Sequence, residues 1–419
     1  MNKQILMRVI REQHQWPVRK TIPRSIHEEW ISCEEIIVIS GVRRCGKSVL
    51  MQQIRARNQE KDYFFNFEDE RLIQFDINDF QLLEACLIEL YGVQRTWYLD
   101  EIQNIAGWER FVRRLYNSGH KVFITGSNAT MLSRELGTHL TGRYIQTELF
   151  PFSFREFLAL HNLYPNVDDL YMLEQSARLQ AEFHQYLTLG GFPAYLKNQS
   201  YDYLLTLYES IIYKDVLQRN QLTSEREILQ LMNYIAGNCA QKHSFSSLGK
   251  IVGIRHPDTI KNYLKYLEDT YLIFVLYKYS PSLKSQMANT KKIYLIDNAL
   301  MHSIGFHPTE NLGPMLENLV LIELKRRGLD VYYYSDKHEC DFFVRSGAHV
   351  TAAYQVTMSL ADNRTRTREI MGLYEAASTL HTNIQMIITL SEEEDILYQG
   401  VMIKVLPVWK WLLSDCQCP

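Results

Sequence analysis

The segment at 41–48 reads G-V-R-R-C-G-K-S and matches the phosphate-binding pattern G-x-x-x-x-G-K-[ST] at every fixed position. It follows a short apolar, β-branched run at 36–40, which predicts a buried strand, and it precedes a segment at 49–54 whose apolar spacing predicts a helix. A strand, a glycine-rich turn and a helix N-terminus together form an anion site, because free backbone N–H groups and the helix dipole point at the phosphates. The pattern therefore constrains the chain to an α/β core that binds a nucleotide.

All residues of this loop are predicted to contact ATP. Lys47 is expected to reach the β- and γ-phosphates, and the Ser48 hydroxyl is expected to coordinate Mg²⁺. A plain glycine-rich turn is the alternative, which the flanking strand and helix disfavour. The predicted ATP-binding set of the loop is Gly41, Val42, Arg43, Arg44, Cys45, Gly46, Lys47 and Ser48.

Length and composition indicate an ordinary soluble protein of several domains. The chain has 419 residues, 46% of them apolar and 22% charged, and roughly three domains are expected. No segment has the apolar length that crosses a bilayer, and the N-terminus lacks a signal-peptide layout, so a cytoplasmic location without membrane contact is expected. The seven cysteines lack the paired spacing of zinc sites. Because the net charge is −3, any contact with DNA must come from local patches.

Two adjacent acidic residues end a second apolar run at 97–99. Asp100 is expected to hold Mg²⁺ through water, and Glu101 is expected to polarise the attacking water as a general base. Their strand is expected to lie beside the first strand, because Mg²⁺ and the water both need carboxylates that face the γ-phosphate. An N-cap at a strand-to-helix turn is the alternative explanation for such a pair.

A third apolar run, at 122–126, ends in Ser127 and Asn128. A polar side chain at this strand end can sense the γ-phosphate by orienting the water from the side opposite Glu101. Asn128 or Ser127 is therefore the predicted sensor, and capping of the helix that follows is the alternative.

One arginine, Arg143, follows a glycine turn and precedes another β-rich run at 144–149. A guanidinium offered to the γ-phosphate of a neighbouring subunit would neutralise the charge that develops in the transition state. A surface salt bridge is the ordinary alternative for a single arginine.

Several short motifs occur in order along nearly the whole chain. They are G-V-R-R-C-G-K-S, Y-L-D-E-I-Q, I-T-G-S-N, L-T-G-R and the later G-G-F-P at 190–193. On these motifs the chain resembles the AAA-type (AAA+) ATPases of bacteria and archaea that carry a restriction-endonuclease-like C-terminal domain. The resemblance implies a homo-oligomer, a hexameric ring or spiral with ATP at the subunit interfaces, and it makes Arg143 the candidate arginine finger.

The first half of the chain is then expected to hold an N-terminal arm at 1–33 and an α/β P-loop AAA+ ATPase core at 34–150. Helical spacing of the apolar residues predicts a helical lid at 151–222. The G-G-F-P segment interrupts this spacing and is expected to form a turn between lid helices.

The spacing at 223–285 predicts a winged-helix domain with three short helices and a β-hairpin wing. The third helix is expected to begin at Pro257, where a missing N–H does no harm. Its outward side chains, Lys261, Asn262 and Lys265, suit a helix that enters the major groove of DNA. Winged helices also bind proteins, so the sequence leaves DNA and a protein partner open.

The remaining part, 286–419, alternates helix and strand and resembles the restriction-endonuclease (PD-(D/E)XK) fold. Its chemistry needs a helix Glu, a strand Asp and an E-x-K on the next strand, so that carboxylates hold Mg²⁺ and the lysine orients water. Glu317 and Asp341 take the first two positions, and the third reads Gln355-Val356-Thr357. Gln355 is a neutral oxygen ligand that can complete the metal set, but Thr357 supplies no ammonium charge.

A basic residue from a helix can replace the missing lysine, and Lys325, Arg364 and Arg366 are the candidates. A degenerate site that keeps the fold for binding is the favoured prediction, because the pattern lacks both a charge and a carboxylate. The basic run at 364–368 can grip phosphates, or it can simply begin an exposed helix.

The leading hypothesis for the whole chain is an ATP-hydrolysing oligomeric motor or switch that engages DNA at recombination or repair junctions. The first alternative is a nucleotide-dependent signalling switch that acts on a protein partner without DNA. An active Mg²⁺-dependent nuclease is the least favoured hypothesis.

Overall fold

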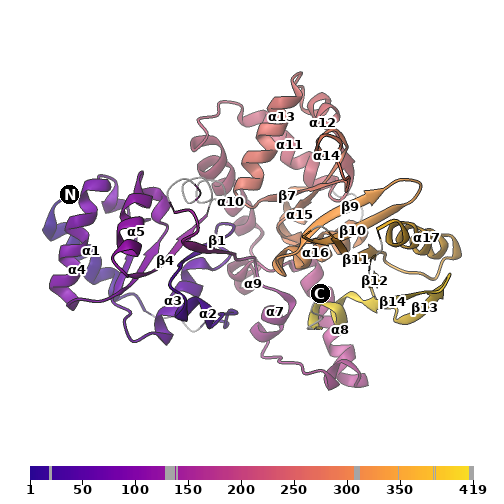
Figure 1. Cartoon of the computed structure of the whole chain (residues 1–419), viewed down its shortest axis with the longest axis horizontal. Helices are drawn as coiled ribbons and strands as arrows, with labels where there is room; N and C mark the ends of the chain where they lie inside the picture. Colours follow the sequence, from indigo (N-terminus) through magenta and orange to yellow (C-terminus); the bar gives the residue numbers. More distant parts are fainter. Residues whose placement is uncertain are drawn as a thin grey trace. The chain divides into compact units, whose positions relative to one another are not determined.

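The computed structural model of the chain forms two compact units (Figure 1). The first unit comprises Met1–Phe150 with Asp269–Tyr271, and the second comprises Pro151–Glu268 with Leu272–Pro419. Among the residues that the structure describes, no helix is both long and apolar enough to cross a membrane. The described residues are 1–17, 21–127, 137, 140–305, 312–347, 349–380, 382 and 384–414.

The first unit is built on a five-stranded sheet in the order β2-β3-β4-β1-β5, and every neighbouring pair of strands is parallel. Four of the strands are apolar, β-branched or aromatic nearly throughout, which suits a sheet that is buried on both faces. Because the strands run the same way, the residues that follow β1, β2, β3 and β4 meet at one edge of the sheet. The strands are β1 Ile36–Ser40, β2 Tyr63–Asn66, β3 Thr96–Asp100, β4 Lys121–Gly126 and β5 Tyr144–Glu148.

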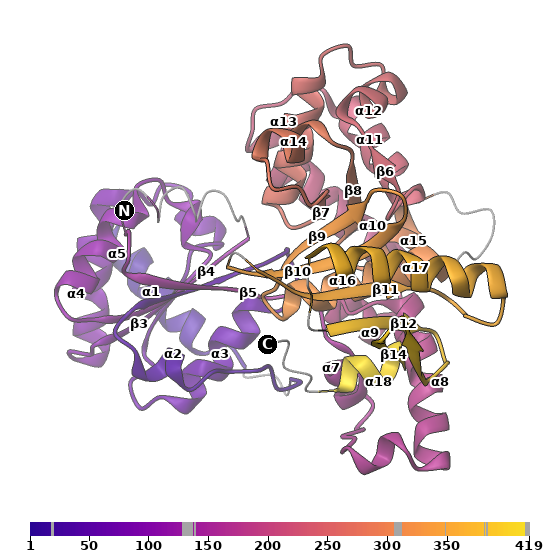
Figure 2. The same cartoon turned by 45° about the vertical axis from the view of Figure 1, so that its right-hand side comes forward.

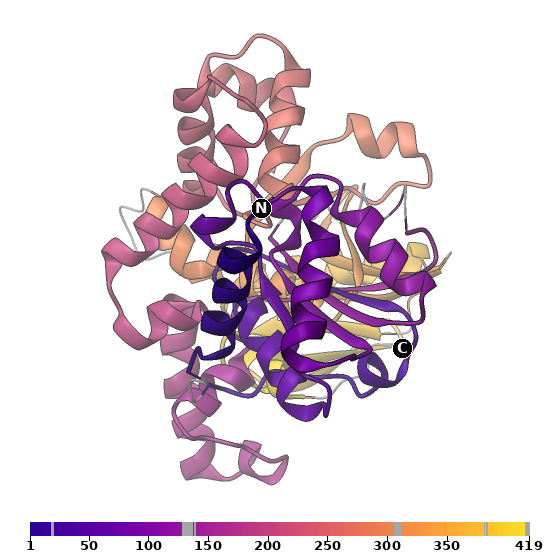
Figure 3. The same ribbon diagram turned by 90° about the vertical axis from the view of Figure 1, so that its left-hand side faces the viewer.

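Helices cover both faces of this sheet. Side chains alternate along a strand, so Ile36 and Val38 pack into one apolar cluster with α1, α4 and α5, whereas Ile37 and Ile39 pack into another with α3. The indigo helix α1 can be followed in Figure 3. The helices of the unit are α1 Lys3–His14, α2 Glu29–Ser32, α3 Lys47–Arg57, α4 Phe80–Tyr91 and α5 Trp108–Asn117, with 3₁₀ turns η1 Glu70–Leu72, η2 Ile77–Asp79 and η3 Ile102–Asn104.

The sequence correctly predicts an α/β core with a loop between β1 and α3, but one expectation about the sheet is wrong. The strand that ends in Asp100 is predicted to lie beside β1, whereas β4 lies between them. The carboxylate still reaches the loop, because the carboxyl ends of β1, β3 and β4 are adjacent along the same edge.

The second unit begins with a helical segment, as the apolar spacing predicts. The predicted turn at 190–193 lies between α8 and α9, where Gly190 has a φ of 65° and Pro193 is the first residue of α9. The backbone N–H of Gly191 donates to Oδ2 of Asp297 at 2.7 Å, which fixes this turn. The helices are α7 Phe154–Leu160, η4 Asp168–Leu170, α8 Leu173–Leu189, α9 Pro193–Asn198, α10 Tyr201–Ser210 and the π-helical η5 Ile211–Gln218.

Four helices, α11 to α14, and a small antiparallel sheet follow. The strand order is β6-β8-β7, and α14 lies between β7 and β8 in the sequence. On α13, Ile260, Leu264 and Leu267 are buried, and the predicted outward residues Lys261, Asn262 and Lys265 are exposed. These elements are α11 Glu225–Gly237, β6 Lys242–His243, α12 Phe245–Val252, α13 Pro257–Asp269, β7 Ile273–Tyr277, α14 Leu283–Ala288 and β8 Lys291–Leu295.

The C-terminal part contains a mixed six-stranded sheet in the order β13-β14-β12-β11-β10-β9. Figure 2 shows α17 lying along β10 and β11, where Ile370 and Leu373 pack against Phe343. The β-rich runs near 331–334, 340–345 and 351–357 predict three strands, which the structure confirms as β9, β10 and β11. The elements are α15 Asn298–Ile304, α16 Leu312–Arg326, β9 Asp330–Ser335, β10 Glu339–Ser346, β11 His349–Val356, α17 Asn363–Leu380, β12 Ile384–Thr389, β13 Glu394–Tyr398, β14 Val401–Pro407 and α18 Val408–Leu413.

Candidate functional site

The loop at 41–48 turns the chain from β1 into α3 through three residues with positive φ: Gly41 at 150°, Arg44 at 67° and Gly46 at 109°. A Cβ on Gly41 would lie 2.2 Å from the carbonyl oxygen of Leu149, so the sheet edge admits only glycine there. Gly46 is the N-cap of α3 and has no side chain that could bond the first N–H groups of the helix. The loop therefore keeps the N–H groups and the helix dipole that attract a phosphate.

Lys47 is buried at the start of α3, with its side chain turned back over the loop. Its Nζ donates to the carbonyl oxygens of Gly41 at 3.1 Å and Val42 at 3.2 Å. The carboxylate oxygen that pairs with it, Oε1 of Glu101, lies 3.7 Å away. The hydrogen-bond acceptors of the ammonium are thus neutral backbone carbonyls, and a phosphate group can replace them.

Asp100 is fully buried at the end of β3 and is held from both sides. Its Oδ1 accepts from the hydroxyls of Ser48, at 3.1 Å, and Thr125, and its Oδ2 accepts from Nδ2 of Asn66 at 2.7 Å. Burial and the adjacent Glu101 raise the pKa of Asp100 to about 6, although the two hydroxyl bonds oppose the shift. A bound divalent cation would favour the ionised form.

The donor set at this edge fits Mg²⁺. The Ser48 hydroxyl and the Asp100 carboxylate are hard oxygen ligands, which this ion prefers, and they lie within 3.1 Å of each other. They belong to different elements, the first turn of α3 and the end of β3, so the fold itself brings the two predicted metal ligands together.

Glu101 adopts a strained backbone conformation, with a φ of 53°. Its N–H donates to Oγ1 of Thr125 at 2.9 Å, and its Oε2 accepts from Nε2 of Gln103. The carboxylate thus lies beside Lys47, with Oε1 of Glu101 3.7 Å from its Nζ.

Two residues of this site were not singled out from the sequence. Asn66 and Thr125 both lie at carboxyl ends of parallel strands, β2 and β4, and both bond the carboxylate of Asp100. A polar residue that closes an apolar run is the signal that could have found them. Gln13 of α1 gives no such signal, yet its side chain exchanges two 2.9 Å hydrogen bonds with the backbone of Asn66.

Arg24 is a third residue that sequence reasoning missed. It is buried, and its guanidinium donates to the carbonyl oxygens of Phe150 at 2.7 Å and Cys45 at 3.4 Å. Its backbone N–H donates to Oε1 of Gln53 on α3 at 2.9 Å. The N-terminal arm therefore lies against the loop, and it places the guanidinium of Arg24 beside the loop.

The other predicted loop residues are buried in the protein or pair with its side chains. Val42 and Cys45 are fully buried, and burial raises the pKa of the Cys45 thiol. Arg43 forms a 3.0 Å ion pair with Glu68.

The predicted sensor lies only in part within the described structure. Ser127 is buried at the end of β4, at the same edge as Asp100, whereas Asn128 lies outside the described residues.

Arg143 lies at the opposite edge of the sheet from the loop. Its carbonyl oxygen accepts from the N–H of Ile36, the first residue of β1, whereas the loop follows the last residue of β1. The length of β1 separates the two, roughly 16 Å at the usual rise per residue. The guanidinium lies 5.8 Å from the ring centre of Tyr116, so Arg143 does not serve the nucleotide site of its own chain.

The residues of the predicted nuclease-like metal site also lie close together in the structure. Glu317 of α16, Asp341 of β10 and Gln355 of β11 lie side by side, and Oε1 of Gln355 accepts from the N–H of Asp341 at 3.2 Å. The ammonium expected from a helix is instead that of Lys292 on β8, whose Nζ lies 2.9 Å from Glu317 and 3.0 Å from Asp341.

The three basic residues that are candidates to replace the missing lysine lie as follows. Arg366 pairs with both carboxylate oxygens of Glu394, at 2.6 and 2.8 Å, and Arg364 is exposed. Lys325 is half-buried near the end of α16, about 12 Å along the helix axis from Glu317. Arg368 pairs with Glu369, so two of the three arginines of the basic run already hold carboxylates.

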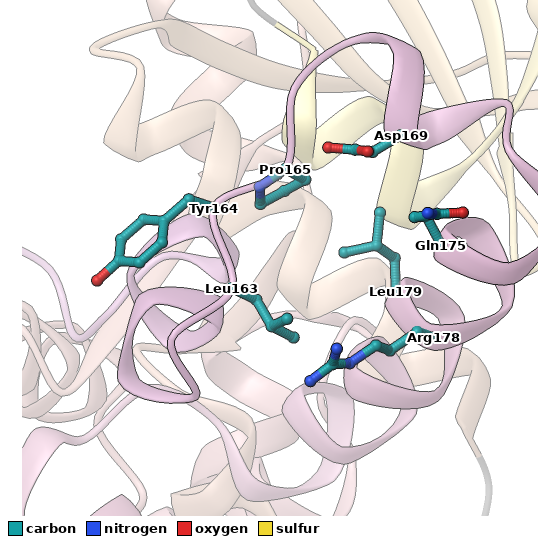
Figure 4. Close-up of a pocket in the computed structure, with 7 residues that line it drawn as sticks. All are labelled: Leu163, Tyr164, Pro165, Asp169, Gln175, Arg178 and Leu179. Atoms are coloured by element: carbon teal, nitrogen blue, oxygen red, sulfur yellow. The ribbon is translucent and has the colours of Figure 1, made fainter.

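A small pocket of about 120 Å³ lies elsewhere in the second unit, around the start of α8 (Figure 4). It contains none of the predicted site residues. Its lining combines apolar side chains with one acid and one base: Leu163, Tyr164, Pro165, Asp169, Gln175, Arg178 and Leu179.

Comparison with known protein families identifies an AAA domain in the N-terminal part of the chain. Residues 34–158 match the AAA domain family, which agrees with the parallel sheet, the loop and the two acidic residues at the end of β3. Residues 180–310 match a domain of unknown function (DUF8612).

Two relatives match the chain over nearly its whole length. The uncharacterized protein MJ1544 of Methanocaldococcus jannaschii is 32% identical over 417 residues, which cover 94% of this chain and 92% of that protein. An uncharacterized protein of Haemophilus influenzae is 31% identical over 396 residues, which cover 90% of this chain and 94% of that protein.

Two solved structures show weaker similarity. One is the assembly of McrB AAA+ hexamers with bound McrC from Thermococcus gammatolerans, with 11% identity, a TM-score of 0.19 and coverage of 44% of this chain and 47% of that chain. The other is Cdc6p from Pyrobaculum aerophilum, with 12% identity, a TM-score of 0.25 and coverage of 73% of this chain and 97% of that chain.

Proposed function

This chain belongs to the same family as MJ1544 of M. jannaschii, and from its AAA domain we propose that it binds ATP with Mg²⁺ and hydrolyses it. The observation that carries the proposal is the meeting of Lys47, Ser48 and Asp100 at one edge of a parallel sheet, directly at the end of a glycine-rich loop. Phosphate release from ATP should require Mg²⁺ and should stop when EDTA removes it. A rate that is indifferent to EDTA would contradict the proposal.

Each residue of the site has a proposed role. Lys47 and the N–H groups of the loop bind the phosphates, and Ser48 and Asp100 hold Mg²⁺, which neutralises charge on the phosphates during transfer. Glu101 polarises the attacking water as a general base. Ser127 or Asn128 orients that water from the neighbouring strand end.

We further propose that the protein acts as a homo-oligomer, a hexameric ring or spiral. The support is the position of Arg143, which lies at the far edge of its own sheet and so could reach only the γ-phosphate bound by a neighbouring subunit. A mixing experiment tests this role. Lys47→Ala and Arg143→Ala chains should each be inactive alone and should regain part of the activity when mixed, because the first supplies the finger and the second the site. No recovery in mixed oligomers would remove Arg143 from the mechanism.

For the second unit we propose a helical lid at 151–222, a winged-helix domain at 223–285 and a restriction-endonuclease-like domain at 286–419, through which the protein engages DNA. The support is α13, which exposes Lys261, Asn262 and Lys265 on one side, as a helix that enters a major groove would. A Lys261→Ala, Lys265→Ala double variant should weaken DNA binding and lower its salt dependence. Absence of binding at low salt to duplex, single-stranded and branched DNA would exclude this half of the proposal.

The alternative proposal is a switch that acts on a protein partner without DNA. Its support is three exposed apolar side chains in the segment 163–179, which also lines the pocket of Figure 4: Tyr164, Val167 and Leu173 are 72%, 70% and 87% exposed. ATPase rates with and without a panel of DNA structures separate the two proposals. Stimulation by one structure favours the DNA motor, and slow turnover that is indifferent to DNA favours the protein switch.

An active nuclease is the least favoured proposal, and cleavage of DNA with Mg²⁺ or Mn²⁺ by the natural chain but not by an Asp341→Ala variant would establish it.

A further inference from the structure

Lys292 is buried among three carboxylates in the second unit, of which that of Asp341 is buried and those of Glu317 and Glu339 are partly exposed. Only 4% of its side chain is exposed, and its Nζ lies 2.9 Å from Oε1 of Glu317, 2.9 Å from Oε1 of Glu339 and 3.0 Å from Oδ1 of Asp341. The three acceptors come from α16 and β10, and the lysine comes from β8. One ammonium, with three N–H donors, thus contacts three carboxylates from two elements of the unit.

Five of the six carboxylate oxygens of this cluster are engaged by protein groups. Tyr294 donates to Oε1 of Glu317 at 2.7 Å, and the N–H of Val356 donates to Oδ2 of Asp341 at 3.0 Å. The second oxygen of Glu339 pairs with Lys242 at 2.7 Å. Together with Lys292, these contacts engage Oε1 of Glu317 and both oxygens of Glu339 and Asp341.

Gln355, the predicted third metal ligand, is engaged as well. Its Oε1 accepts from the N–H of Asp341, and its Nε2 donates to Glu369 on α17. Within the described residues, no group of three or more His, Cys, Asp or Glu side chains is arranged to hold a metal ion.

Buried carboxylates that face one another need a compensating cation, because their desolvation and mutual repulsion are both unfavourable. In a nuclease-like site that cation is a divalent metal ion. Here a positive charge from the chain itself stands among the carboxylates at hydrogen-bond distance.

We propose that the ammonium of Lys292 takes the place of a divalent cation among Glu317, Glu339 and Asp341, and turns this cluster into a metal-free joint between β8, α16 and β10. The same carboxylates should gain affinity for Mg²⁺ or Mn²⁺ when the lysine charge is removed and their side chains rearrange around the ion. The inference rests on the geometry of the second unit and is independent of ATP hydrolysis.

The first test compares Mn²⁺ binding by the nucleotide-free natural chain and by a Lys292→Met variant, followed through the electron paramagnetic resonance signal of free Mn²⁺. Methionine keeps much of the length of the side chain and removes its charge. The variant should bind Mn²⁺ at least about tenfold more tightly than the natural chain, because the carboxylates of Glu317 and Asp341 lose their compensating cation and attract a dication strongly. Mn²⁺ should also raise the melting temperature of the variant more than that of the natural chain. A folded variant without this gain would overturn the proposal.

A second comparison keeps the proposal testable if Lys292→Met does not fold. The natural chain and an Asp341→Asn variant are titrated with Mn²⁺ under the same conditions. The proposal predicts equal Mn²⁺ binding, because the cluster holds no metal in either chain. Loss of one bound Mn²⁺ in the Asp341→Asn variant would show that the natural cluster is a metal site and would overturn the proposal.

Discussion

Two lysines, one in each unit, are buried to the same extent, with 4% of each side chain exposed, but their neighbours are of opposite kinds. Lys47 donates to two backbone carbonyls and has one carboxylate oxygen at 3.7 Å. Lys292 has three carboxylates within 3.0 Å. The charge of Lys47 therefore remains available to an anionic ligand, whereas that of Lys292 is fully compensated. The formal charge of the surroundings, rather than burial, separates a ligand-binding lysine from a structural one.

The largest expected effect on ATP turnover follows from the loss of the Lys47 charge. Lys47→Ala should lower ATP turnover by roughly a hundredfold or more, because a preorganised cation at the phosphates is removed. Phosphate release and binding of a fluorescent ATP analogue measure the change. Lys61→Ala is the matched control, since Lys61 is an exposed lysine of the same unit. An equal loss in both variants would mean that the effect is not specific to the site.

The next effect separates chemistry from binding within the same site. Glu101→Gln keeps the size of the side chain and removes its capacity to accept a proton, so hydrolysis should fall by about a hundredfold while ATP binding is retained. Single-turnover hydrolysis and nucleotide titration measure the two quantities separately. Undiminished turnover would show that Glu101 is not the general base.

Substitution of Asn66 should have an intermediate effect on the Mg²⁺ requirement, because Asn66 orients the carboxylate of Asp100. Removal of its 2.7 Å bond in Asn66→Ala leaves Asp100 less firmly oriented, and the Mg²⁺ concentration needed for half-maximal ATPase activity should rise by about tenfold, as for other groups that orient a metal ligand. Asn66→Gln is the matched control, because it keeps the amide and should restore part of the affinity. A change in the maximal rate with no change in the Mg²⁺ requirement would contradict a positioning role.

The smallest effect concerns a buried acid that is held by N–H groups. Burial raises the pKa of Asp297 to about 7, although the N–H groups of Gly191 and Ala299 oppose the shift. The folded chain then binds one more proton than the unfolded chain between about pH 4 and pH 7, so the contribution of Asp297 to stability is present at low pH and is lost as the pH rises through about 7. Denaturation midpoints at about pH 5 and about pH 7.5 should show this slope, at most about 1.4 kcal/mol per pH unit.

Asp297→Asn is the variant that isolates this contribution. It should flatten the dependence of the denaturation midpoint on pH over the same range, whatever its effect on overall stability. An unchanged slope would assign the pH dependence to other groups.

The sequence predicts the local structure at the loop and at the acidic pair well, because the residues concerned are contiguous. The loop at 41–48 and the pair Asp100 and Glu101 each occupy one short segment with a strand beside it, so the local pattern contains most of the information. The order of strands in a sheet is a tertiary property, and for that reason the sequence does not predict the position of β4 between β1 and β3. Thr125 joins the site only because of that order.

The second site shows the same limit more clearly. Glu317, Asp341 and Gln355 can be found because they fit a known order of ligands along the chain. Lys292 precedes all of them and comes from a different sheet, so no spacing rule connects it to the motif. Only the packing of β8 against α16 and β10 reveals that the cluster has a lysine.

The most direct measurement compares Mg²⁺-dependent ATP hydrolysis by three full-length chains, the natural chain, Lys47→Ala and Lys292→Met, each shown to be folded. Because Lys292 takes no part in the nucleotide site, its variant should hydrolyse ATP within about threefold of the natural rate, as expected for independent sites. Lys47→Ala should be inactive. Hydrolysis by Lys47→Ala at the natural rate, or loss of hydrolysis in folded Lys292→Met, would contradict the assignment of one lysine to the ligand and the other to the fold.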